Sequence, residues 1–389
     1  MQICMEEYKM EYPSIKVLSQ DFELLDEIDT YTSLRFKRSW QSYGEFELHV
    51  VGYNNNLSIS NYIMLDNNTD KVGIIKSLNT SLTTRGVETI AKGYHLNGIM
   101  TQRIVLPYEE SANHGYFCVP KQVEGVATES VSAETIIKAF VRACFPYDTS
   151  DPRSIGLYIP ENLHRGMYTV WLSRYEQLDE VLQKVCEYTD VGYRVYLDLL
   201  NKRLACDLLE GVDRSSGQSE NNRVIMSQNF ESINSLNWII DTTKEKNVVY
   251  AGGAGEDENR LVLAVTNKKE MPTGLNRTEV FSDCGTLEVA ETDEAISLEE
   301  EAKHKLLDYK SQESMTAENN LSGSFIYGKD FDLGDLVTVA DSTINKMEDK
   351  RITEIEECYE ARALSVKLTF GTASAHLNRV IKSFLPTVK

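Results

Sequence analysis

The stretch Ser324-Phe-Ile-Tyr-Gly-Lys-Asp-Phe-Asp-Leu-Gly-Asp-Leu-Val-Thr-Val339 carries the strongest fold signal in the chain. Gly328 and Gly334 can adopt positive φ angles, which most other residues avoid. The aspartates of the stretch, which include Asp332 and Asp335, can accept hydrogen bonds from the backbone of their own turn. The pattern is typical of a turn between two strands, and it contains no evident catalytic group.

Strands are expected on both sides of this turn. The pattern predicts a short strand over 324–327 and a second over 336–339, because apolar and β-branched residues gather there. Two more β-rich segments follow, at 351–359 and 363–370. Together they indicate a small antiparallel barrel or sheet.

Composition limits the classes of function. A chain of 389 residues is long enough for two to four domains, and 41% hydrophobic with 26% charged residues is typical of a soluble globular protein. The formal net charge of −20 argues against binding of a nucleic-acid backbone. The acidity can simply keep the protein soluble, or it can form a wall that DNA passes without sticking.

The cysteines and the termini indicate a protein made inside the cell. The seven cysteines are dispersed without C-x-x-C spacing, which favours reduced thiols and a cytoplasmic environment. No apolar run approaches ~18 residues, so no transmembrane helix is predicted. The acidic N-terminus lacks the positive and apolar regions of a signal peptide.

The N-terminal part alternates with a period of two from residue 15 to about 105. Phe46 and Leu48, for example, alternate with Glu45, Glu47 and His49, as in a half-buried strand. Several such strands predict a first tube-like β-barrel domain over 1–106. A connecting loop is expected over 107–129.

Helical periodicity appears next and predicts an α+β insertion over 130–210. One helix is expected to be capped by Ser132, and a second to open with a capping box at Ser173. A hairpin is predicted over 193–208.

The remainder is predicted to be a second tube-like β domain over 223–375, after a polar linker at 211–222. It includes an irregular arm at 271–284 and a helix at 297–311. A C-terminal tail at 376–389 contains a short amphipathic stretch. The expected fold class is α+β and mainly β, with two antiparallel barrels, the insertion and a few short helices.

No catalytic, cofactor or metal site is predicted. The glycine cluster Val249-Tyr-Ala-Gly-Gly-Ala-Gly255 is followed by carboxylates and another β run, so it indicates a hairpin turn and not a phosphate loop. The histidines lack metal spacing, and His49 and His304 are expected on polar faces. Adjacent acids such as Glu356-Glu357 diverge to opposite faces of a strand. Aromatic residues at 158–171 could form a sugar platform, although strand packing is the favoured interpretation.

Several short motifs resemble a known family. They include Trp40-Gln-Ser-Tyr-Gly-Glu-Phe-Glu-Leu48, Asn247-Val-Val-Tyr-Ala-Gly-Gly253 and Tyr327-Gly-Lys-Asp-Phe-Asp-Leu-Gly-Asp335. The family comprises siphophage tail proteins that are similar to the central hub of T-even phage baseplates, and it also occurs in prophages and in contractile, phage-tail-like bacteriocins. The residues that carry the resemblance are Trp40, Gly44, Phe46, Leu48, Gly73, Gly93, Arg103, Gly252, Gly253, Arg277, Tyr327, Gly328, Asp332, Gly334 and Asp335.

The resemblance implies a homotrimeric hub. Two related barrels per subunit would form a pseudo-hexameric ring between the six-fold tail tube and a three-fold spike or tip. Partners would be the tail tube or distal tail protein, the spike, other baseplate proteins and the tape-measure protein, with DNA only as passing cargo. The protein would be made in the bacterial cytoplasm and assembled into the tail. Because the chain ends at Lys389, soon after the second barrel, no cell-wall-degrading domain is expected.

Two other functions stay open at this point. One is a tail-associated glycan or peptidoglycan hydrolase with a dispersed carboxylate pair, which the abundance of acidic residues permits. The other is a receptor-binding module of the tail tip that uses tyrosine-rich loops of the insertion. The hub interpretation assigns the glycines and aspartates of 327–335 to ring geometry and to no ligand.

Overall fold

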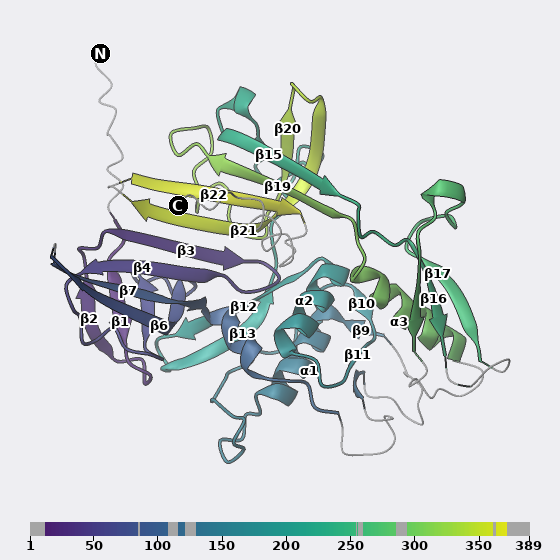
Figure 1. Ribbon diagram of the computed structural model, residues 1–389, viewed down its shortest axis with the longest axis horizontal. Coiled ribbons are helices and arrows are strands. Elements are labelled where there is room, and N and C mark those ends of the chain that lie inside the picture. The colour runs from purple at the N-terminus through teal and green to yellow at the C-terminus, as the bar shows by residue number, and fades with distance from the viewer. Residues whose placement is uncertain are drawn as a thin grey trace.

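The fold is α+β and mainly β, as predicted, and its main element is a large antiparallel sheet (Figure 1). The computed structural model describes residues 12–84, 86–107, 116–120, 130–253, 255, 260–284, 294–360 and 363–371. The predicted C-terminal tail and most of the predicted connecting loop lie outside these residues.

The first β region contains seven strands and one short helix. Its alternation of apolar and polar residues follows from a sheet that has one buried face; β4, for example, is buried at every second residue. The elements are β1 (Ile15–Leu18), β2 (Leu24–Ile28), β3 (Ser33–Ser39), β4 (Glu45–Val51), β5 (Tyr62–Leu65), β6 (Val72–Thr83), β7 (Gly86–His95) and η1 (Leu96–Gln102).

The second β region continues the sheet of the first. Its elements are β14 (Ile225–Met226), η3 (Gln228–Phe230), β15 (Ile233–Asp241), β19 (Gln312–Asn319), β20 (Leu336–Asp341), β21 (Lys346–Glu360) and β22 (Ala363–Gly371). β21 pairs with β3, so the order is β15-β19-β22-β21-β3-β4-β7-β6-β5-β1-β2. The two β regions are therefore parts of one continuous sheet.

The predicted strand at 324–327 is wrong. Tyr327 makes only an isolated bridge to Phe331, and the residues around it form a compact turn. The Asp330 side chain accepts a hydrogen bond from Ile326 N at 2.7 Å, and Asp330 N donates to Ile326 O at 2.8 Å. These local bonds use the backbone groups that a strand would need for pairing.

The insertion packs beneath the sheet, around an apolar core that it shares with β1, β5, β6 and η1 of the first β region (Figure 1). It contains β8 (Phe117–Val119), β9 (Val131–Ser132), α1 (Ala133–Cys144), β10 (Tyr168–Thr169), β11 (Trp171–Ser173), α2 (Leu178–Thr189), β12 (Gly192–Asp198) and β13 (Arg203–Leu209). Ser132 caps α1 by accepting a hydrogen bond from Thr135 N, as predicted. The second helix begins later than predicted. Ser173 belongs to β11, where it pairs with Phe117 of β8, and its hydroxyl donates a hydrogen bond to the Glu176 carboxylate.

Residues 242–311 leave the sheet between β15 and β19 and form a separate unit, here called the lobe. It consists of β16 (Val248–Gly252), β17 (Val262–Thr266), η5 (Gly274–Asn276), β18 (Glu279–Asp283) and α3 (Glu294–Leu307). The predicted irregular arm ends in β18, which runs parallel to β16, and the predicted third helix starts earlier than expected. None of the helices within the described ranges is long and apolar enough to cross a membrane.

The predicted linker at 211–222 is not a free connection. Leu336 N donates to Val212 O at 3.0 Å and Arg214 N donates to Leu336 O at 2.8 Å, so the segment lies along the start of β20. Its polar composition suggested a solvated chain, but polar side chains also suit a segment bound through its backbone.

The cysteines behave as small core residues. Five of the described ones are buried with free thiols, and Cys358 is half-buried. Burial raises the pKa of Cys118 and Cys206 to about 12, so both stay as uncharged thiols near neutral pH.

Candidate functional site

Trp40 lies where the first β region, the insertion and the second β region meet. It directly follows β3 and is 1% exposed. Its backbone N donates to Thr353 O of β21 at 2.9 Å, and its carbonyl accepts from Tyr193 N of β12 at 3.3 Å. One residue thus connects three parts of the chain that are far apart in sequence.

The Trp40 indole requires glycine at two neighbouring positions. A Cβ atom at Gly334 would lie 1.9 Å from Cζ3 of the indole, and one at Gly192 would lie 2.5 Å from Cδ2. Gly334 also has a φ of +90°, a conformation that residues with a side chain adopt only at a cost. The predicted turn therefore uses Gly334 for both its backbone angle and its contact with Trp40.

Arg351 ties the same junction together. Its guanidinium lies 5.4 Å from the centre of the Trp40 ring and donates to Gly334 O at 2.6 Å. It also forms a bidentate pair with Asp190, at 2.9 Å and 2.6 Å, at the end of α2. Arg351 was not among the predicted residues, because nothing in the local sequence pattern marks it.

Two predicted aspartates of the turn attach it to its neighbours. Asp335 accepts from Val212 N at 2.9 Å and from Arg214 Nε at 2.8 Å, while Asp332 pairs with Arg38 of β3 at 2.6 Å. The predicted bonds to the backbone of the turn are also present, since Asp335 accepts from Asp332 N at 3.1 Å and Asp332 accepts from Leu333 N at 2.7 Å.

Behind the turn lies a buried polar cluster around Glu357, which is 1% exposed. Its carboxylate pairs with Lys71 at 2.7 Å, and accepts from the hydroxyl of Tyr359 at 2.8 Å and from that of Tyr327. Burial acts to raise the pKa of Glu357, but Lys71 and Arg38 outweigh it and hold that pKa below its ordinary value. A carboxyl that stays ionised cannot serve as a general acid near neutral pH.

A cleft of about 320 Å³ opens beside the turn. Its lining carries three ion pairs, which are Arg38–Asp332, Arg194–Asp70 and Arg214–Asp335. These charges balance one another.

His95 also lines this cleft. Its Nε2 atom lies 2.7 Å from Asp70 O, and burial lowers its pKa to about 4. The described residues contain no group of three potential metal ligands. The cleft is thus a charge-balanced joint between three parts of the chain.

A second group of predicted residues lies within the first β region. Phe46 packs over glycines on two other strands: a Cβ at Gly73 would lie 2.5 Å from Cδ1 of its ring, and one at Gly93 would lie 2.7 Å from Cε1. A Cβ at Gly44 would lie 1.8 Å from Lys37 O, and Leu48 is fully buried nearby. Here the glycines allow close packing of backbone against an aromatic ring.

The other predicted residues are not at the junction. Arg103 directly follows η1, and its guanidinium lies 5.0 Å from the Phe145 ring of the insertion. Gly252 ends β16, and Gly253 N donates to Leu261 O at 2.8 Å, which fits the predicted hairpin. Arg277 lies in the lobe and donates to the Tyr250 hydroxyl at 2.9 Å.

Strand packing, the favoured interpretation of the aromatic residues at 158–171, holds for Trp171 of β11, whereas the prediction for His304 is wrong. Trp171 is only 3% exposed, and His304 stacks on it at 4.0 Å. His304 therefore lies in a contact between α3 and the insertion, away from the polar helix face where it was expected. The Tyr158 ring is covered by Arg203 at 3.7 Å.

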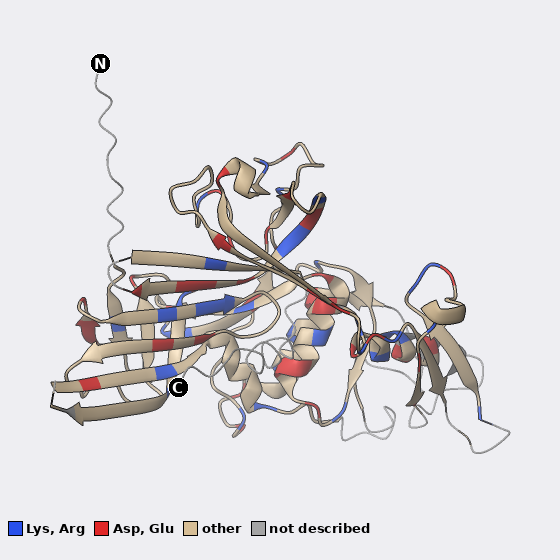
Figure 2. Cartoon of the chain, turned by 45° about the horizontal axis from the view of Figure 1, so that its top comes forward, with Lys and Arg blue, Asp and Glu red and all other residues tan. Residues whose placement is uncertain are grey.

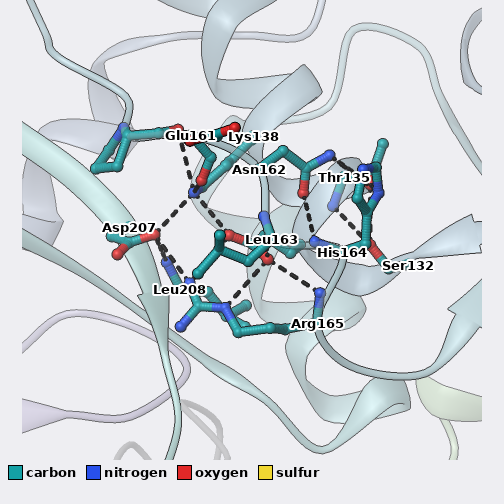
Figure 3. Close-up of polar contacts among 12 residues, drawn as sticks. Ser132, Thr135, Lys138, Glu161, Asn162, Leu163, His164, Arg165, Asp207 and Leu208 are labelled. Atoms are coloured by element: carbon teal, nitrogen blue, oxygen red, sulfur yellow. Dashed lines mark hydrogen bonds and ion pairs between the residues drawn. The ribbon is translucent and has the colours of Figure 1, made fainter.

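A buried ion network fixes the insertion (Figure 3). Glu134 is fully buried on α1, and its carboxylate pairs with Lys138 at 2.7 Å and with Arg165 at 3.0 Å. Lys138 also donates to Glu161 O at 2.8 Å and pairs with Asp207 at 2.9 Å. The network therefore holds the 160–165 loop and β13 on α1. The one sequence signal for this network is the i, i+4 spacing of Glu134 and Lys138 on α1.

The pKa of Glu134 excludes a role as a general acid. Burial alone would raise this pKa, but hydrogen bonds from Arg165 and Lys138 and from two backbone N–H groups lower it to about 2. Every partner in the network is satisfied by another part of the insertion, as expected for a structural cluster.

Comparison with known proteins identifies relatives of the whole chain. The family described as Siphovirus ReqiPepy6 Gp37-like protein matches residues 14–372. No curated protein matches the sequence.

Solved structures share the fold at low sequence identity. A tail protein from Neisseria meningitidis MC58 superposes with a TM-score of 0.54 at 13% identity, over 92% of this chain and 95% of that one. The 43 kDa tail protein of prophage MuSo2 from Shewanella oneidensis gives 0.54 at 11%, over 93% and 98%. The prophage tail protein gp18 from Listeria monocytogenes EGD-e gives 0.53 at 13%, over 95% and 99%.

The Gly334→Ala variant is expected to lose more stability than Gly328→Ala. Both glycines have positive φ angles, but a Cβ at Gly328 meets nothing within 4 Å, whereas one at Gly334 collides with Trp40. Gly328→Ala should cost about 1 kcal/mol of unfolding free energy, and Gly334→Ala about 1–3 kcal/mol more. Urea unfolding followed by circular dichroism measures the difference. Equal losses would show that the contact with Trp40 does not require glycine.

The Glu134→Gln variant is expected to be destabilised by roughly 3 kcal/mol at pH 7, because it leaves buried cations without their charged partner. Since the pKa of Glu134 is lowered to about 2, its stabilisation is present above about pH 4.5 and is lost as pH falls towards 2. The difference in unfolding free energy between wild type and variant should therefore become smaller below pH 4.5. Glu161→Gln is the control, because Glu161 contacts Lys138 through its backbone carbonyl. A difference in unfolding free energy that stays constant with pH would contradict the stabilising role of the ionised Glu134 carboxylate.

Proposed function

The chain belongs to the Siphovirus ReqiPepy6 Gp37-like family, and we propose that it is a structural hub protein of a phage or prophage tail. Three copies would form a ring that joins the six-fold tail tube to the central spike or tip. The tail tube or distal tail protein, the spike and other baseplate proteins would be its partners. The protein would be made in the bacterial cytoplasm and assembled into the particle.

The continuous sheet is the observation that carries this proposal. Each subunit places two blocks of strands side by side in one wall, joined where β3 pairs with β21. Three copies would supply six such blocks around an axis, which is the number needed to meet a six-fold tube. A protein whose two β regions formed unconnected sheets would not offer such a wall.

Charged residues recur along the strands of this wall (Figure 2), and many of them share one of its faces. Because side chains alternate along a strand, the residues opposite the apolar core share this face. Ion pairs cross it between neighbouring strands, for example Arg35 with Glu356, Lys37 with Glu354 and Lys92 with Glu47. The charged residues on this face are Arg35, Lys37, Glu45, Glu47, His49, Glu88, Lys92, Glu318, Glu354, Glu356, Glu360 and Lys367.

This face would suit the wall of a channel. Carboxylates outnumber cations on it, and Arg35, Lys37 and Lys92 are each engaged by a glutamate. Binding to nucleic acid depends on cations that are free to neutralise phosphates. Such a surface would let DNA and the tape-measure protein pass without sticking.

A structural role also accounts for the buried titratable groups. Glu134 and Glu357 are held ionised by cations, and His95 is kept neutral by burial. The adjacent acids Glu356 and Glu357 diverge as predicted, since Glu356 lies on the charged face while Glu357 is buried behind the turn. Clearing of purified cell walls by the isolated protein would instead support a hydrolase.

The expected stoichiometry is three copies per tail. Cryo-electron microscopy of tail ends that contain this protein should place three subunits between the tube and the spike, with the charged faces towards the axis. A ring with another number of copies, or charged faces on the outside, would contradict the hub proposal.

Reversal of charge on the proposed channel face is expected to slow DNA ejection. Glu45 and Glu360 are exposed on this face, so the double variant Glu45→Lys, Glu360→Lys would place free cations along the path of the phosphates. Ejection from assembled particles should become slower, and higher salt should relieve the effect.

The matched control is Glu220→Lys, because Glu220 is an exposed acid on the 211–222 segment and lies away from the charged face. Particles that assemble normally and eject DNA at the wild-type rate in the double variant would remove the channel assignment. Failure of assembly in the double variant alone would place this face in a contact between subunits.

A further inference from the structure

The lobe is attached to the sheet at a single place. It leaves after Asp241 and returns at Gln312, and these two residues are paired across β15 and β19. Just beyond them, Lys246 N donates to Tyr309 O at 2.9 Å. Two adjacent chain segments, 242–247 and 308–311, therefore form the whole covalent connection. Figure 1 places the lobe at the end of the molecule opposite β1 and β2.

The lobe has an apolar core of its own, separate from those of the insertion and the sheet. α3 packs against one face of the sheet formed by β17, β16 and β18. The buried residues of this core are Val249, Ala251, Val265, Cys284, Leu298, Ala302 and Leu306. A unit with its own core can move as a rigid body without losing its internal packing.

Contact between the lobe and the insertion is centred on His304 of α3. Its ring stacks on Trp171 of β11 with 4.0 Å between ring centres, and meets the Tyr188 ring of α2 edge-on at 5.1 Å. Leu307 packs against the insertion core, and Leu172 packs against the lobe core. Among the described residues, the apolar packing between the two units therefore includes the His304 stack, Leu307 and Leu172.

The rest of this contact is charged. Lys184 of α2 pairs with Glu176 at 3.0 Å and lies 3.9 Å from Asp308, which follows α3. A contact that combines a few aromatic rings with ion pairs resembles a transient interface more than a continuous core. Interfaces of that kind permit relative motion of the units they join.

His304 is held in this contact as a neutral ring. Its Nε2 atom is buried and has no hydrogen-bond partner in the described part of the chain. Burial first, and then Lys305, Lys303 and Lys184, lower the pKa of His304 to about 3. The Glu301 carboxylate lies 3.9 Å from Nδ1 and acts in the opposite sense, but the three lysines and burial outweigh it.

We propose that the lobe is a hinged unit, which turns about segments 242–247 and 308–311 when the stack of His304 on Trp171 and Tyr188 opens. The stack is the latch of this hinge. Opening exposes the His304 ring to water, where it can take up a proton. The inference concerns motion within one subunit, and it does not depend on the hub proposal.

Acid is expected to favour the open position through His304. A ring exposed to water has a pKa near 6.5, so opening takes up a proton below that pH and should be favoured about tenfold more at pH 5.5 than at pH 7.5. Burial raises the pKa of Glu187 and Glu301 in the closed contact, and these groups act in the opposite direction. A comparison with His304→Phe, which keeps an aromatic ring but removes the titration, isolates the contribution of His304.

Single-molecule energy transfer on the full chain tests the hinge. Dyes would be attached at Leu275→Cys in the lobe and Leu200→Cys in the insertion, whose native side chains are 103% and 92% exposed. Cys4 and Cys358 would be replaced by serine, since the other cysteines are buried. At pH 7.5 one transfer efficiency should dominate. His304→Ala should increase a second population roughly two- to tenfold, because it removes the aromatic contacts.

The proposal requires that the second population also increase at pH 5.5 in the wild type and much less in His304→Phe. Trp171→Ala gives an independent test from the other side of the contact, and thermal unfolding must show that each variant is folded. Phe281→Ala, on the lobe but away from the latch, is the matched control and should leave the populations unchanged. If folded His304→Ala shows a single transfer efficiency, equal to that of the wild type at both pH values, the hinge proposal is overturned.

Discussion

The packing of Trp40 against backbone that carries no side chain is the constraint on which the rest of the structure depends. Its indole occupies the space that a Cβ would need at both Gly192 and Gly334. β12 and the 327–335 turn can therefore approach the indole only because glycine stands at these two positions. Arg351 then covers the ring and links the turn to the end of α2. The insertion and the second β region thereby receive fixed positions relative to β3.

That position lets β21 pair along β3 and makes two β regions into one sheet. Once joined, the sheet has one side that packs on the protein core and one side that carries the charged residues. Ion pairs such as Arg35–Glu356 connect side chains 321 residues apart in sequence. Each exposed pair adds at most about 1 kcal/mol of stability. Their main consequence is that Arg35, Lys37 and Lys92 on this side are already engaged by carboxylates.

Local sequence patterns predicted those features of the fold that depend on interactions between residues close together in the sequence. The alternation around Phe46, the cap at Ser132 and the β12–β13 hairpin follow from the period of burial and from backbone hydrogen bonding nearby. The sequence could not predict the β3–β21 pairing, since no residue in either strand marks its partner. The capping box at Ser173 misled because its hydroxyl and Glu176 bind each other within a strand-to-helix connection. Gly334 was found, but its partner Arg351 was not.

The two joints of the molecule differ in a way that explains their roles. At Trp40 the contact is fully buried, sterically closed by glycines and fixed by a bidentate ion pair, so any displacement would open a cavity and break hydrogen bonds at once. At His304 the rings contact each other among charged groups, with Lys184 of α2 lying 3.9 Å from Asp308 after α3. Separation there exposes groups that water can solvate well. The first joint therefore resists motion, whereas the second permits it.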